Sequence, residues 1–191
     1  MQPERLAISL EQILASSLKS QYHGALAMLG AAIEMCPDDE WVASSQGVPF
    51  WRVSYHALYY THLYLERDDT DFHPWEGHQS GLQHLDDVPG PPEIEALLEP
   101  PNTPPQTGVP LTRAEILAYW AWCDALVDPA VDGLDLLAPT TGFRWHSPPR
   151  PKLEHQLGTI RHIQHHASQL SARLRAATGE GVDWVGSARR V

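Results

Sequence analysis

The chain has 191 residues, of which 42% are apolar, and a formal net charge of −11 with its histidines neutral. This length and composition predict one globular domain over residues 1–191 and exclude a fully disordered chain. The acidic balance argues against a nucleic-acid partner, because binding to phosphates needs a basic face.

The apolar spacing of residues 19–35 predicts a first helix that ends near Cys36, since Pro37 restricts the residue before it to extended backbone. The pattern leaves open whether residues 4–17 continue this helix or form a separate turn. A second helix is predicted over residues 49–69, beginning at Pro49 and apolar on nearly every side. Its tyrosines and tryptophan also suit a strand, but its length favours a helix.

Local start and stop residues mark two further helices. Thr112 and Glu115 form a capping-box pattern that predicts the start of a third helix, which Pro129 is expected to close. The fourth helix is predicted from about Lys152 to Thr178, with Gly179 as its stop.

A long connection, residues 67–110, separates the second helix from the third. It is first rich in carboxylates and then rich in prolines, so it cannot form one regular element. It is long enough to pass from one end of a helix bundle to the other. The sequence therefore predicts an all-α fold, a four-helix bundle with a long crossover between helices 2 and 3.

Two cysteines, Cys36 and Cys123, lie far apart and match no metal-binding spacing, so we expect reduced thiols in a cytoplasmic protein. The first residues lack the basic start and apolar run of a signal peptide. No apolar stretch approaches the length of a membrane span, so no membrane association is expected.

The fourth predicted helix carries three crowded histidines. His162 and His166 are four positions apart, which places both on one helix face at a spacing that suits one metal ion. Such pairs also occur as ordinary surface or hydrogen-bonded buried residues. The pair lies on a shoulder of the aliphatic stripe, as expected either for the mouth of a bundle or for a solvated face. His165 is expected to face solvent.

His56 lies within the apolar second helix and therefore needs a partner, because an unpaired buried polar group is costly. The partner is either a hydrogen-bonding group in the core or a metal ion shared with His162 and His166. The second possibility gives a three-histidine site with open coordination positions. Zinc, nickel and ferrous iron all accept nitrogen ligands, so these residues do not identify the divalent metal ion.

These histidines and their surroundings resemble the DinB-like (DinB/YfiT) superfamily. The matching segments are "VSYHALYY" around His56, "HIQHHASQL" around His162 and His166, "LTRAEILAYWAWC" and "VDWVG". The resemblance extends over roughly residues 15–187. One departure is Ala167-Ser168, where many members have a glycine before the glutamine, which affects packing more than ligation.

The resemblance implies a four-helix bundle, often a homodimer, in which His56, His162 and His166 hold a divalent metal ion. Some relatives are transferases or isomerases that depend on small thiols such as bacillithiol or mycothiol. We therefore expect a metal-dependent enzyme acting on a small molecule with a low-molecular-weight thiol. The alternatives are a metal-dependent hydrolase and a non-catalytic metal-binding bundle that acts through a dimer or protein-interaction surface.

Two residues are further candidates near the site. Trp75, with the acidic residues of the connection, is expected to shape the substrate entrance. Arg161 could offset the repulsion between an acidic chain and an acidic co-substrate, but an ordinary exposed arginine is the favoured interpretation. No catalytic base is assigned.

Overall fold

The computed structural model describes residues 8–45, 47–85 and 108–188. These residues form helices and no strand, which confirms the all-α class. The helices are α1 (Leu10–Met35), α2 (Asp38–Trp41), α3 (Phe50–Leu65), α5 (Arg113–Gly133) and α6 (Lys152–Thr178).

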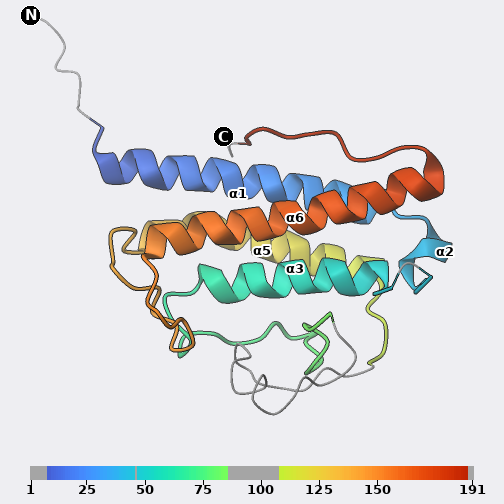
Figure 1. The fold of residues 1–191 in the computed structure, drawn as a ribbon, viewed down its shortest axis with the longest axis horizontal. Coiled ribbons are helices and arrows are strands. Elements are labelled where there is room, and N and C mark those ends of the chain that lie inside the picture. Colours follow the sequence, from blue (N-terminus) through green and yellow to red (C-terminus); the bar gives the residue numbers. More distant parts are fainter. Residues whose placement is uncertain (1–7, 46, 86–107, 189–191) are drawn as a thin grey trace, which may run out of the picture.

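The long helices lie alongside one another along the long axis of the molecule (Figure 1). Helices α1 and α3 each pack against both α5 and α6. The core between them includes aliphatic side chains and several fully buried tyrosines, which are Tyr22, Tyr55, Tyr59 and Tyr119. Buried hydroxyls need hydrogen-bond partners, so such a core also fixes how the helices are aligned.

Gln156 of α6 links three helices through its fully buried amide. The Tyr22 hydroxyl of α1 donates to Gln156 Oε1 at 2.6 Å, and Gln156 Nε2 donates to the Tyr64 carbonyl of α3 at 2.9 Å. Polar groups with paired partners in the interior favour one alignment of the helices over others. The amide thus sets the relative position of α3 and α6.

Side-chain hydrogen bonds set the start of α1 and the end of α3. A Ser9–Gln12 capping box begins α1, so residues 10–17 continue the first helix. Helix α3 ends at Leu65, earlier than the predicted 69, because Asp68 Oδ1 accepts hydrogen bonds from Thr70 and draws the chain into a turn.

The prediction that Pro129 closes the third helix is wrong. Helix α5 continues through Pro129 to Gly133. A proline within a helix costs about 3 kcal/mol in isolation. In this chain the last turn is held by tertiary contacts: Val131 is buried, and Lys19 Nζ lies 2.6 Å from Asp132 Oδ2.

Helix α6 has the predicted bounds, Lys152–Thr178. Gly179 follows it with φ of 85°, a left-handed conformation that glycine adopts without strain. The chain then turns back along α1 (Figure 1), where the Ala188 amide donates to the Ser20 carbonyl.

Residues 86–107 of the predicted crossover lie outside the described residues. The described part that follows α3, residues 66–85, packs over α3, with Leu82 in the core and the His84 carbonyl accepting from Arg52 Nε at 2.8 Å. Among the described residues, no helix is both long enough and apolar enough to span a membrane.

Two glycines inside long helices test this packing. A Cβ on Gly30 would lie 2.8 Å from the Trp120 ring, which is anchored by an Nε1 donor bond of 2.7 Å to the Leu26 carbonyl. We expect Gly30→Ala to lower the free energy of unfolding by about 1–3 kcal/mol through overpacking. A Cβ on the exposed Gly158 would meet no atom within 4 Å. Gly158→Ala should therefore raise the free energy of unfolding by about 0.5–1 kcal/mol.

Urea denaturation of both variants measures these two free energies. If Gly30→Ala stabilised the protein as much as Gly158→Ala, Trp120 would not lie against α1 as described.

Candidate metal centre

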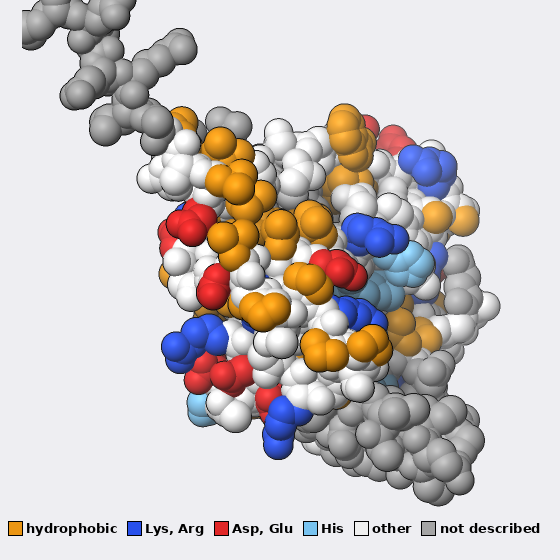
Figure 2. All heavy atoms as spheres, turned by 60° about the vertical axis from the view of Figure 1, so that its left-hand side comes forward, with side chains coloured by type: hydrophobic (Ala, Val, Ile, Leu, Met, Phe, Trp, Pro, Cys, Tyr) orange, Lys and Arg blue, Asp and Glu red, His pale blue; other side chains and the backbone are white. Residues whose placement is uncertain are grey.

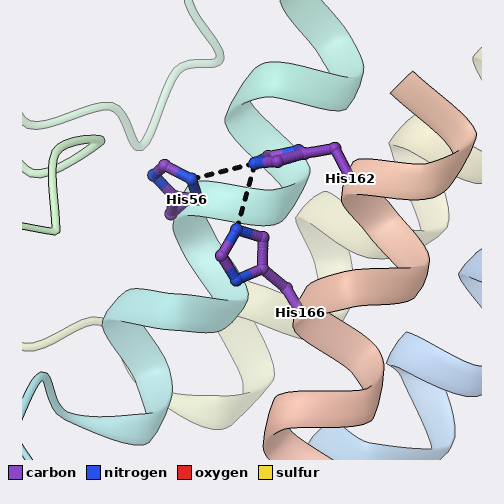
Figure 3. A group of neighbouring side chains, drawn as sticks. All are labelled: His56, His162 and His166. Atoms are coloured by element: carbon purple, nitrogen blue, oxygen red, sulfur yellow. Dashed lines mark hydrogen bonds between the residues drawn. The ribbon is translucent and has the colours of Figure 1, made fainter. Parts of the chain in front are cut away.

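Three histidines from two neighbouring helices point their rings at one another (Figure 3). His56 comes from α3, and His162 and His166 lie one turn apart on α6. The Nε2 atom of His162 is 3.0 Å from Nε2 of His56 and 3.0 Å from Nε2 of His166. The ligand atoms of the three residues lie within 4.8 Å of one another, close enough to hold a metal ion.

The outer nitrogens of two of these rings are fixed by hydrogen bonds. His56 Nδ1 lies 2.6 Å from the Gln83 carbonyl oxygen, which can only accept, so the proton is on Nδ1. His166 Nδ1 lies 3.0 Å from Gln169 Oε1 and is likewise the donor. The Nε2 atoms of His56 and His166 therefore carry lone pairs that face His162.

This arrangement leaves the three neutral rings with too few protons between them. His162 Nε2 can donate one proton to one neighbour, which leaves the other close nitrogen–nitrogen contact without a proton. A cation at the meeting point would accept all three lone pairs. Such convergence is what a nitrogen-coordinated metal ion requires.

Burial keeps the three imidazoles neutral, as metal ligands must be. It lowers the pKa of His162 to about 3, with further lowering by His166 and His165. The pKa of His56 is also well below its usual value, through burial and then the proximity of His162 and His166. Burial lowers the pKa of His166 too, although its bond to Gln169 acts in the opposite direction.

The donor set fits a divalent ion such as zinc, nickel or ferrous iron. Ligating histidines usually donate their other ring N–H to a carbonyl or carboxylate, which orients the ring. Gln83 and Gln169 supply those acceptors for His56 and His166. Among the described residues, His162 Nδ1 is buried and has no such partner.

The group contains no fourth histidine, cysteine, aspartate or glutamate among the described residues. Beside it lies a pocket of about 390 Å³, lined in part by His56 and His162. A coordination position that the protein does not fill would therefore be within reach of a small molecule. Catalytic metal sites keep such a position, whereas structural sites fill it with protein.

The remaining histidines lie elsewhere. His165 is exposed, as predicted. His62 Nδ1 lies 3.0 Å from the Tyr119 hydroxyl, on another side of α3, and His78 is paired with the Tyr55 hydroxyl. His155, which is too far along α6 to share the ion, instead lines the neighbouring pocket.

The two further candidates are not at the site. Trp75 stacks on Tyr119 of α5, with ring centroids 4.7 Å apart, and is not among the residues that line the pocket. Arg161 lines a different depression, together with Trp184. The basic residue that does line the pocket beside the histidines is Arg150, which sequence reasoning missed.

Comparisons with known proteins give no match: no family model, no curated protein and no solved structure matches this chain. The evidence for the chemistry of the site is therefore its geometry.

We expect metal binding to depend on all three converging rings. Protein purified without a histidine tag should carry about one divalent ion per chain. Replacement of His56, His162 or His166 by alanine should remove the ion, because two imidazoles hold it far less tightly. His165→Ala, on the same helix but exposed, should retain it. Elemental analysis of the variants measures this, and loss of the ion in His165→Ala alone would refute the assignment.

Proposed function

We propose that this protein is a divalent-metal-dependent transferase. It would use a low-molecular-weight thiol as the co-substrate that reacts with a small-molecule substrate. The observation that carries the proposal is the convergence of three neutral imidazole nitrogens beside a pocket, without a fourth protein ligand among the described residues. A divalent ion held there by the three histidines would lower the pKa of a coordinated thiol or water and so supply a nucleophile at neutral pH.

The chain's own residues hold and orient this centre. His56, His162 and His166 are neutral ligands, so they leave the ion its full positive charge. The Gln83 carbonyl and the Gln169 amide fix two of the rings through their Nδ1 protons. Tyr60 packs against the His56 and His162 rings, with centroid distances of 4.8 and 5.8 Å, and so helps to hold both rings in place.

The family and the topology belong to the same proposal. The DinB-like resemblance implies a four-helix bundle with a crossover after α3, and the packing of α1 and α3 against both α5 and α6 supports it. The resemblance is also the sole source of the thiol and of the homodimer, which both stay predictions.

A hydrolase would use the same ion with water in place of the thiol. A non-catalytic metal-binding protein would have no use for an open coordination position, and the pocket beside His56 and His162 argues against it.

Cobalt-substituted protein distinguishes these functions. Titration with bacillithiol, mycothiol or glutathione should produce a thiolate-to-cobalt charge-transfer band with at least one of them, because a coordinated thiol is deprotonated. The band should be absent in His162→Ala and present in His165→Ala. If none of the three thiols changed the spectrum of cobalt-loaded protein, the thiol-dependent function would be wrong and the hydrolase would become the better proposal.

A further inference from the structure

The pocket next to the three histidines has a composition that differs from the rest of this acidic chain. Its volume is about 390 Å³, within the range of small-molecule sites. Its lining includes no aspartate or glutamate among the described residues, although the chain carries 24 of these residues. The lining is His56, Tyr60, Tyr64, His146, Arg150, His155, Gly158, Thr159 and His162.

Arg150 gives this pocket a positive charge. It lies just before α6, is exposed, and forms no hydrogen bond or ion pair with any described residue. Burial lowers the pKa of His146 and of His155, and the positive charge of Arg150, which lines the same pocket, lowers both further. Arg67 and Arg144 at the surface are paired with Asp71 and Asp69, whereas Arg161 and Arg175, like Arg150, have no such partner among the described residues but lie outside this pocket. A guanidinium without a partner in a pocket suits a carboxylate or another oxyanion.

His155 also lines this pocket. Its ring is 6% exposed, and neither of its nitrogens has a hydrogen-bond partner among the described residues. Both nitrogens are themselves buried, so the ring contributes its face and edge to the pocket wall and leaves Arg150 as the group that a ligand can pair with. The ring packs against Tyr64 and His146 at centroid distances of 4.5 and 4.8 Å, so the polar end of the pocket is also aromatic.

The opposite end of the pocket is the three-histidine centre. His155 and His162 both line the pocket and are seven residues apart on α6, which corresponds to roughly 10 Å of helix. Histidine side chains are visible at the surface beside Lys and Arg side chains in Figure 2. A molecule about 10 Å long could therefore contact both ends at once.

We propose that this pocket binds a small organic carboxylate with an apolar or aromatic body, whose carboxylate pairs with Arg150 near His155 and whose other end faces His56 and His162. The reaction at the histidine end rests on the proposed function, whereas the binding of the carboxylate by Arg150 does not. Tyr60 and Tyr64 form the walls along which the body lies. The carboxylate would thus serve as the handle that orients the substrate.

Equilibrium binding of 4-phenylbutyrate and of its neutral analogue 4-phenylbutanamide tests this assignment. Both should be titrated by NMR into metal-free and zinc-loaded protein. We expect the carboxylate to bind more tightly than the amide in both forms, because Arg150 is present in both. Arg150→Gln should weaken carboxylate binding roughly fivefold and leave amide binding unchanged.

Arg161→Gln is the matched control, since it removes the same charge from an exposed site of α6 outside this pocket. It should leave both affinities unchanged. Gly158→Leu provides an independent variant, because its side chain would enter the open space at this exposed position of the lining. It should weaken the binding of both probes without loss of zinc.

Several results would overturn the proposal. Equal affinity for the two probes, equal effects of Arg150→Gln and Arg161→Gln, or no binding at about 10 mM would each do so. Carboxylate binding that required zinc and was unchanged in Arg150→Gln would also overturn it, because the carboxylate would then bind the ion itself. That result would leave the proposed function intact. Selective, Arg150-dependent binding by protein that takes up no zinc would support the pocket and refute the metal-dependent function.

Discussion

Three imidazole nitrogens lie in close contact with too few protons to bridge them, and this constraint is the one on which the whole candidate site depends. Two Nε2–Nε2 contacts of 3.0 Å meet at His162, while the Nδ1 protons of His56 and His166 are committed to Gln83 and Gln169. Burial opposes protonation of all three rings. A shared metal ion would resolve this conflict at a single point, and the fold maintains the arrangement by aligning α3 with α6 through Gln156.

The site also depends on segments outside the helices. The connection after α3 supplies the Gln83 carbonyl that orients His56, and the segment before α6 supplies Arg150 and His146 to the adjacent pocket. Lys152 at the start of α6 is buried and donates to the carbonyls of Arg67 and Thr141, which ties both segments together. The two connecting segments thus support different parts of the candidate site, one orienting His56 and the other lining the pocket.

Local patterns predicted the features that depend on local physics. The end of α6 follows from Gly179, and its start follows the N-cap residue Pro151. The shared face of His162 and His166 follows from helix geometry. The position of His56 in an apolar helix predicted that it needs a partner. By contrast, the continuation of α5 past Pro129 depends on the tertiary contacts of Val131 and Asp132. Gln83, Arg150 and His155 could not be identified because their roles arise only when separate segments fold together. Gln169 differs from these three, since it lies within the histidine-rich segment of α6.

Zinc K-edge X-ray absorption of zinc-loaded protein tests the central claim most directly, because it reports the atoms around the ion. We predict three imidazole nitrogens at about 2.0–2.1 Å and one further light-atom ligand from solvent. Replacement of His165 should leave this spectrum unchanged. A sulfur neighbour at about 2.3 Å, or a coordination shell with fewer than three imidazoles, would contradict the assignment of His56, His162 and His166 as the ligands of one ion.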